Sequence, residues 1–218
     1  RRGLRMVRAL LRLLLRLDNL LYRYTSVAAV RYGGGLHPKH RLTAYHDFFA
    51  RHIRAGERVL DIGCGNGVVD WDVATRTGAL VTGVDRDAAA IAHAQAHYRH
   101  ERLRFRVGEA WAAAEGEAFD VVVLSNVLEH LDGRVEFLQR IRERLAPQRL
   151  LVRVPLFERD WRVPLKAELG VDHRLDPTHY TEYRETEFRD ELRSAGFDVV
   201  EAEIRWGEIW AVCRATPA

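Results

Sequence analysis

The chain has 218 residues, of which 47% are hydrophobic and 30% are charged. This length and composition are typical of one folded domain with some decoration, and they exclude an intrinsically disordered chain. The net charge of +3 is uneven: residues 1–23 hold seven arginines and one aspartate, or +6, which leaves −3 for the remainder. A mildly acidic body argues against a nucleic-acid-binding surface, so no nucleic-acid partner is expected.

Residues 4–23 have the pattern of an amphipathic helix. At 100° per residue, the seven arginines fall on one arc of roughly 120°, and mostly leucines fill the rest. An arginine every three or four residues excludes a simple transmembrane span and argues against a signal peptide. Two interpretations stay open for residues 1–24. The helix either lies in a membrane surface with its arginines at anionic headgroups, or docks on the domain or on the second subunit of a homodimer.

Three glycines at 33–35 break this helix. We therefore expect an amphipathic helix and a Gly-rich linker over residues 1–36, followed by a folded domain over 37–218. The two cysteines, Cys64 and Cys213, lie far apart and form neither a disulfide framework nor a zinc-binding spacing. This favours a reducing compartment and predicts a cytoplasmic protein, peripheral on the inner face of the membrane if the helix binds lipid.

From Arg58 onward, short apolar runs alternate with helical patterns. Strands are predicted at 58–63, 79–85, 103–108, 119–126, 149–155, 197–205 and 208–215. Helices are predicted at 68–77, 88–99, 134–145 and 185–195, with helical spacing also over 37–53 and an irregular insertion at about 156–185. This alternation indicates a doubly wound α/β fold with a mostly parallel sheet. The short turn near Gly207 requires one of the last two strands to run antiparallel.

The first strand ends in a glycine-rich turn, "DIGCGNG", at residues 61–67. In a doubly wound sheet, ligands bind beyond the carboxyl ends of the strands, and glycines let the backbone approach them closely. The spacing departs from a dinucleotide fingerprint, because the third glycine comes one residue early. Asp61 would also repel a pyrophosphate, whereas it would attract a ligand with a cationic centre and an ammonium group.

Acidic residues also close the next two strands. Asp85 can accept hydrogen bonds from both hydroxyls of a ribose, although Asp85 or Asp87 could instead cap the following helix. Glu109, or the backbone of Ala110 and Trp111, can contact an adenine edge. Adenosine with a positively charged amino-acid tail describes S-adenosyl-L-methionine.

These motifs resemble those of the class I S-adenosylmethionine-dependent methyltransferases. "VLDIGCGNG" is similar to the first motif of that family, "VTGVD" to the second, "VGEAW" to the third and "FDVVVLSNVLEHL" to the fourth, in the same order, within a likeness over roughly 37–214. The resemblance implies a seven-stranded sheet in the order 3-2-1-4-5-7-6 with the last strand antiparallel. Glu109 departs from the aspartate that is more frequent in the family. The predicted cofactor-binding residues are Asp61, Gly63, Cys64, Gly65, Asn66, Gly67, Asp85, Arg86, Glu109, Ala110, Trp111 and Asn126.

Candidate residues for the acceptor side come from two segments. "SNVLEHL" resembles the segment of quinone-biosynthesis and sugar O-methyltransferases that carries a Glu-His pair, here Glu129 and His130 at the start of the next helix. "DPTHYTEY", in the insertion, resembles their Thr-His element. His179 is the first choice for a general base, oriented by Asp176, because a histidine can be neutral at pH 7. Alternatively, these histidines and Glu129 orient the loops or hold a divalent ion.

Two smaller hypotheses concern the neighbouring residues. The glycines at 33–35 could give a lid mobility, with Lys39 or His40 meeting the methionine carboxylate. Cys64 stands where the family has a small residue, so close packing is favoured over a nucleophilic role.

The main hypothesis is therefore an S-adenosylmethionine-dependent methyltransferase acting on a hydroxyl of a small-molecule or glycan/lipid-linked acceptor. The transfer is a displacement at an activated sulfonium, so no metal is obligatory. Two alternatives are a methyltransferase of RNA or protein, and a non-catalytic, membrane-recruited module that binds the cofactor.

Overall fold

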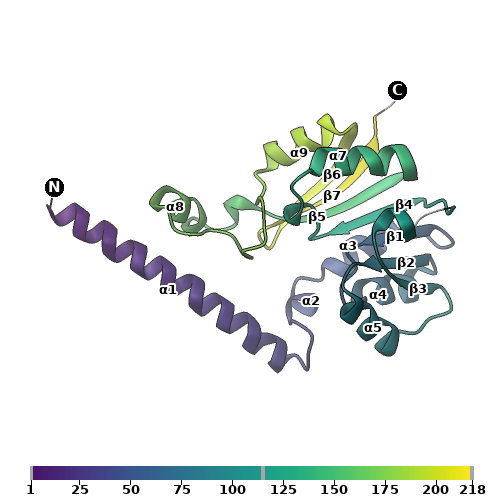
Figure 1. Ribbon diagram of the computed structural model, residues 1–218, viewed down its shortest axis with the longest axis horizontal. Helices are drawn as coiled ribbons and strands as arrows, with labels where there is room; N and C mark the ends of the chain where they lie inside the picture. Colours follow the sequence, from purple (N-terminus) through teal and green to yellow (C-terminus); the bar gives the residue numbers. More distant parts are fainter. Residues whose placement is uncertain (1, 114–115, 217–218) are drawn as a thin grey trace.

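The protein is a seven-stranded α/β sandwich from which one long helix projects (Figure 1). The computed structural model describes residues 2–113 and 116–216. The strand order is β3-β2-β1-β4-β5-β7-β6, with β7 antiparallel to both of its neighbours and the other pairs parallel. This confirms the topology expected from the motifs and from the turn at Gly207.

The strands closely follow the apolar runs in the sequence. They are β1 (Arg58–Ile62), β2 (Leu80–Asp85), β3 (Leu103–Val107), β4 (Val121–Ser125), β5 (Arg149–Pro155), β6 (Phe197–Arg205) and β7 (Glu208–Ala215). The central strands β1, β4 and β5 are almost completely buried, because helices cover both faces of the sheet.

The helices lie in two layers around the sheet. They are α1 (Arg2–Tyr32), α2 (Lys39–Leu42), α3 (Tyr45–His52), α4 (Val68–Thr77), α5 (Ala88–His97), α6 (Ala110–Ala113), α7 (Arg134–Arg140), α8 (Arg162–Leu169) and α9 (Glu185–Ser194). Short 3₁₀ turns η1 (Leu128–His130) and η3 (Phe157–Arg159) follow β4 and β5, and a π turn η2 (Ile141–Leu145) extends α7.

Alternate residues of the strands build a core on each face of the sheet. Leu150 and Val152 of β5 belong to the cluster that α7 and α9 cover, whereas Leu151 belongs to the cluster under α3 and α4. Figure 1 shows α7 and α9 on one side of the sheet and α3, α4 and α5 on the other. The carboxyl ends of the parallel strands are therefore left to loops, where ligands bind in this architecture.

Several local expectations need correction. The helical spacing over 37–53 forms two helices, because Ala44 adopts a left-handed φ of 53° between them. The first helix extends to Tyr32 and ends at the three glycines, as the sequence predicts. The stretch expected to be irregular contains α8, and Glu129 and His130 lie in the separate 3₁₀ turn η1 rather than at the start of α7.

Across residues 2–113 and 116–216, none of the helices has both the length and the apolar character needed to cross a bilayer.

Two glycines of the β1–α4 turn provide a matched test of the packing that shapes it. An alanine Cβ at Gly67, where φ is +76°, would lie 2.4 Å from the Phe105 ring. We expect Gly67→Ala to lower the free energy of unfolding by about 2–4 kcal/mol, through overlap and backbone strain together. At Gly65 φ is +55° and no described atom lies within 4 Å of that Cβ position. Gly65→Ala should therefore lower it by only about 1–2 kcal/mol, from strain alone. Urea denaturation of both variants measures the difference, and equal losses would contradict it.

Candidate active site

The turn between β1 and α4 presents bare backbone at the carboxyl end of the sheet. The Gly63 and Cys64 amides donate to the Val84 carbonyl at 2.7 and 3.1 Å, which fixes the turn against β2. The Gly65 amide donates to Asp85 Oδ2 at 2.9 Å. Because the space at the Gly65 Cβ position is open within the described residues, a ligand can approach the main chain there.

Asp85 stands at the end of β2, where the sequence predicts a ribose contact. Its Oδ1 accepts from the Asp87 amide at 2.9 Å, so both carboxylate oxygens are held by backbone donors. Asp87, and not Asp85, caps α5, since its Oδ1 accepts from the amides of Ala89 and Ala90. Asp85 is thus oriented beside the glycine turn without serving as the helix cap.

A second carboxyl lies beside Asp61 under the same turn. Asp61 is 3% exposed, and Asp70 of α4 is 1% exposed. Apart from the contact between the two carboxyls, Asp61 Oδ1 and both carboxyl oxygens of Asp70 have no hydrogen-bond partner among the described residues. Burial raises the pKa of Asp61 to about 8, and burial together with the charge of Asp61 raises the pKa of Asp70 well above its usual range. The pair therefore retains a proton near neutral pH.

The other predicted cofactor-binding residues surround this turn. Arg86 forms an ion pair with Glu109 at 2.7 Å between the ends of β2 and β3. Asn66 Oδ1 accepts from the Val68 amide at 3.3 Å. Ala110 begins α6, whereas the Trp111 ring packs against Phe137, which leaves only its backbone for the adenine side.

Cys64 has a packing role in this arrangement. Its Sγ would lie 2.9 Å from a Cβ at Gly83, and it packs against the cluster of Ile91, Ala94 and Phe105. Burial raises the pKa of the Cys64 thiol, so the thiol stays protonated. A nucleophilic role is thereby disfavoured, as the sequence indicated.

A cluster of histidines and a tyrosine from α2 and α3 walls the site on the side of α4. Tyr45 Oη lies 2.6 Å from His40 Nδ1, which also lies 3.0 Å from His46 Nε2, and His46 Nδ1 contacts Asp72 at 3.3 Å. Burial and neighbouring positive groups lower the pKa of His40 to about 3, so it is neutral. The Nδ1 atom of His40 is thus already in contact with Tyr45 and His46. Lys39, which forms no ion pair within the described residues, is the better candidate for a cofactor carboxylate.

On the acceptor side, Glu129 and Asn126 form a fixed pair. Glu129 is fully buried, and its Oε1 accepts from Asn126 Nδ2 at 2.7 Å, while Oε2 has no partner in the described chain. Burial raises the pKa of Glu129, although the Asn126 hydrogen bond opposes the shift. The Tyr180 amide donates to the Glu129 carbonyl at 2.7 Å, which ties the insertion to the β4 loop.

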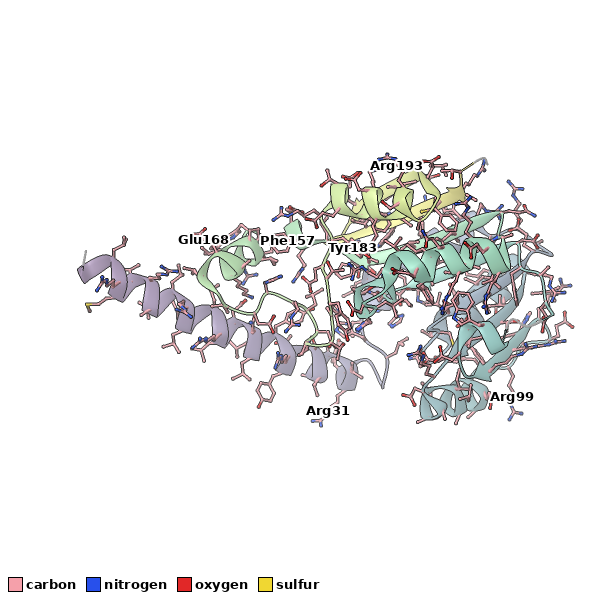
Figure 2. The ribbon with its side chains drawn as sticks, turned by 45° about the horizontal axis from the view of Figure 1, so that its top comes forward. Arg31, Arg99, Phe157, Glu168, Tyr183 and Arg193 are labelled. Atoms are coloured by element: carbon pink, nitrogen blue, oxygen red, sulfur yellow. The ribbon has the colours of Figure 1, made fainter. Side chains whose placement is uncertain are left out.

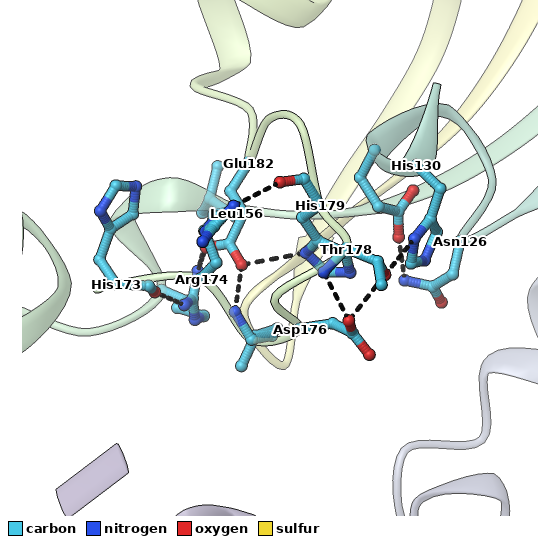
Figure 3. A network of polar contacts seen from close by, with 12 residues as sticks. Asn126, His130, Leu156, His173, Arg174, Asp176, Thr178, His179 and Glu182 are labelled. Atoms are coloured by element: carbon cyan, nitrogen blue, oxygen red, sulfur yellow. Dashed lines mark hydrogen bonds and ion pairs between the residues drawn. The ribbon is translucent and has the colours of Figure 1, made fainter. Parts of the chain in front are cut away.

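His179 is oriented by Glu182 rather than by Asp176 (Figure 3). His179 is 6% exposed, and its Nδ1 lies 3.2 Å from Glu182 Oε1. Glu182 also pairs with Arg159 and accepts from the Leu175 amide. Burial alone would raise the pKa of Glu182, but the contacts with His179, Arg159 and the Leu175 amide outweigh it and lower the pKa. Glu182 is therefore ionised and holds a proton on His179 Nδ1.

His130 belongs to a neighbouring set of contacts. Its Nδ1 lies 2.9 Å from Thr178 Oγ1, which donates to Asp176 Oδ1 at 2.6 Å. Asp176 thus orients Thr178 and, through it, His130. The rings of His130 and His179 meet edge to face with centroids 4.6 Å apart.

Three predicted catalytic residues converge in space. One ligand atom from each of Glu129, His130 and His179 lies within 4.8 Å of the other two. A carboxylate and two imidazoles are a donor set that binds Zn²⁺ or similar ions. The same atoms can instead accept protons from a bound hydroxyl, since His179 Nε2 and Glu129 Oε2 make no hydrogen bond within the described residues.

Sequence reasoning missed three residues that shape this site. Glu182 is three residues from His179, but these residues form a loop rather than a helix, so no periodic pattern predicts the contact. Asp70 carries no local signal, because only the packing of α4 places it against Asp61. Arg153 looks like a misplaced charge in an apolar strand, yet it forms a bidentate pair with Glu208 at 2.6 Å and lies 3.8 Å from the Tyr45 ring centroid.

Comparison with known proteins agrees with this geometry. Residues 36–202 match the family model described as "Methyltransferase domain". The chain is similar to the ubiquinone biosynthesis O-methyltransferase of Roseobacter denitrificans, with 36% identity over 156 residues that cover 67% of this chain and 62% of that protein. It is 35% identical over 167 residues to the protein of the same description from Azorhizobium caulinodans, covering 72% and 64%. The chain thus spans less than two thirds of the length of these curated relatives.

Two solved structures illustrate the shared fold. Human N-acetylserotonin methyltransferase in complex with S-adenosylmethionine has a TM-score of 0.64 and 23% identity, covering 81% of this chain and 52% of that one. Magnesium protoporphyrin IX methyltransferase from Synechocystis, with bound S-adenosylhomocysteine, has a TM-score of 0.63 and 19% identity, covering 80% and 83%.

The buried carboxyl pair makes a prediction about stability and pH. The pKa of Asp61 is about 8 in the folded chain against 3.8 for an ordinary aspartate. Between these values the unfolded chain releases the proton that the folded chain keeps. The free energy of unfolding should therefore fall as the pH rises above about 4, because both carboxyls have raised pKa values in the folded chain. Asp70→Asn removes one ionisable group and supplies an amide donor, so this fall should shrink by about 1–3 kcal/mol.

Urea denaturation at a series of pH values measures this effect. Asp132→Asn, at an exposed aspartate before α7, is the matched control. Parallel pH profiles for Asp70→Asn and the unsubstituted protein would show that the two carboxyls do not share a proton.

Proposed function

The chain belongs to the class I S-adenosylmethionine-dependent methyltransferases, and from this premise we propose that it methylates a hydroxyl group of a small or lipid-linked organic acceptor. The observation that carries the proposal is the pairing of His179 Nδ1 with the buried, ionised Glu182. When Nδ1 of a neutral imidazole donates to a carboxylate in this way, Nε2 is the nitrogen that can accept a hydroxyl proton.

The cofactor, S-adenosyl-L-methionine, supplies a methyl group on a positively charged sulfur. Three features of the turn fit this molecule: the open approach at Gly65, the oriented carboxylate of Asp85 for ribose hydroxyls, and the unpartnered Asp61 Oδ1 near the place of a cationic tail. Lys39 would meet the carboxylate of that tail. The chain's own task is then to hold an acceptor oxygen in line with the methyl group.

The acceptor residues divide this task between them. His179 would take the hydroxyl proton on Nε2, while Glu182 stabilises the imidazolium that forms. Glu129 Oε2 would accept a hydrogen bond from the same or an adjacent hydroxyl, since Asn126 occupies only Oε1. His130, held by Thr178, would close the other side of the acceptor. The names of the curated relatives, ubiquinone biosynthesis O-methyltransferases, support a hydroxyl acceptor on a ring with a lipid tail.

Substitution of the dyad should separate chemistry from cofactor binding. We expect His179→Ala to lower kcat by about 10²–10⁴-fold, because the general base is lost, with the affinity for S-adenosylhomocysteine unchanged. Glu182→Gln should lower kcat less and change the pH dependence of kcat/KM, because the imidazole loses its orienting charge. Methyl transfer from labelled cofactor to dihydroxybenzoate-type phenols measures turnover, and calorimetry measures cofactor affinity. Normal turnover by His179→Ala would end its role as base.

Removal of metal ions tests the other use of the same three side chains. With His179 as base, we expect incubation with EDTA followed by desalting to leave turnover unchanged. Loss of turnover that Mg²⁺, Mn²⁺ or Zn²⁺ restores would instead assign Glu129, His130 and His179 as ligands of a divalent ion. Thr178→Ala is a useful control, because it frees His130 without removing a ligand atom.

A further inference from the structure

The N-terminal helix α1 touches the rest of the chain along one face only. Leu15, 4% exposed, packs with Leu11 against Leu169 and Val171 at the end of α8. Asp18, on the same face, accepts from Arg162 Nη1 at 2.8 Å and Lys166 Nζ at 2.6 Å. These contacts join α1 to the insertion that carries His179, as the adjacent positions of α1 and α8 in Figure 1 also show.

The opposite face of α1 is apolar and exposed. It is formed by Leu10, Leu13, Leu14, Leu17, Leu20 and Leu21, whose exposed fractions range from 45% to 65%. At 100° per residue these six leucines lie within an arc of roughly 120°, centred opposite Leu15. In Figure 2, where Glu168 marks α8, side chains project from α1 on the side away from α8. A continuous apolar stripe of this length is an interaction surface.

A basic stripe borders the apolar face along its length. Arg5, Arg8, Arg12, Arg16 and Arg23 lie within an arc of roughly 80° between the apolar face and the face that docks on α8. None of these five arginines forms an ion pair with another residue in the described ranges. The single acidic residue of α1, Asp18, is already paired with α8.

We propose that α1 binds the surface of an anionic lipid membrane, lying in its plane with the leucines in the acyl boundary and the arginines at the headgroups. Charge complementarity favours this occupant over a second copy of the chain. In an antiparallel, two-fold pairing the same flank of each helix meets its equivalent, so arginines would face arginines. In any other pairing of two copies of α1, the helix offers no further carboxylate to neutralise them.

The attachment of α1 places the membrane next to the acceptor side of the enzyme. α8 follows Trp161, which is 73% exposed, and precedes the loop that holds His179. A chain bound through α1 would therefore meet an acceptor that resides in the bilayer from the side of its insertion. The membrane surface itself is independent of the proposed reaction, because it rests on α1 alone.

Vesicle sedimentation with the full chain tests the proposal. We expect co-sedimentation with vesicles of phosphatidylcholine and phosphatidylglycerol, weak binding to phosphatidylcholine alone, and loss of binding as the salt concentration rises. Arg8→Gln with Arg16→Gln should weaken binding by about 25-fold, at about fivefold for each arginine. The matched control is Arg99→Gln with Arg140→Gln, which changes the net charge equally at exposed sites outside α1 and should leave binding unchanged.

Leucine substitutions separate the membrane from a protein partner. Leu14→Gln with Leu21→Gln should abolish binding to the anionic vesicles, whereas Val200→Gln, at an exposed apolar site on β6, should not. Circular dichroism checks that the helix persists. Light scattering without lipid gives the oligomeric state. A dimer that Leu14→Gln with Leu21→Gln dissociates, together with no vesicle binding by the unsubstituted chain, would assign the face to a second copy and overturn the proposal. Turnover of soluble acceptors by these variants should be normal, so this test fails or succeeds independently of the enzymatic one.

Discussion

The hydrogen bond from the Gly65 amide to Asp85 is the contact on which the cofactor side of the protein depends. It joins the turn after β1 to the end of β2. The amides of Gly63 and Cys64 donate hydrogen bonds to the Val84 carbonyl and hold the same turn against β2. Parallel pairing of β1 with β2 brings the two strand ends together, so the contact follows from the sheet. It leaves an exposed strip of main chain and an oriented carboxylate side by side, which is the geometry that a nucleoside needs.

This arrangement has a cost in the carboxyl pair beneath it. Asp61 and Asp70 are buried together, and apart from the contact between them three of their four carboxyl oxygens lack partners within the described residues. Two carboxylates in such a place cannot both be ionised, so the pair keeps one proton. This proton favours the stability of the folded chain, whereas its loss would favour attraction of a cation. A positive group that arrives at Asp61 favours release of that proton. Binding of a cation at this place and protonation of the pair are therefore linked.

Local pattern was sufficient for the sheet but not for the acceptor site. The limits of β6 and β7 follow from apolar alternation around the turn at Gly207, and the limits of α4 follow from the glycine turn and Gly78. These features depend on neighbours in sequence. The partner of His179 was assigned to Asp176 because both lie in one motif, whereas the folded loop turns Asp176 towards Thr178 and leaves Glu182 for the histidine. The direction of a loop depends on contacts such as Arg159 with Glu182, which no local pattern encodes.

The insertion after β5 contacts both the N-terminal helix and the partner of the proposed base. Arg162 and Lys166 of α8 form ion pairs with Asp18 of α1. Arg159, just before α8, forms an ion pair with Glu182, the partner of His179. Only two residues separate Arg159 from Arg162, so the residue that contacts α1 and the residue that contacts the partner of the proposed base lie close together in the sequence. The charge of the chain is divided in the same way: residues 1–23 carry +6 and the remainder −3, so the basic character is concentrated in α1, whereas buried carboxyls of the domain set the protonation of the site.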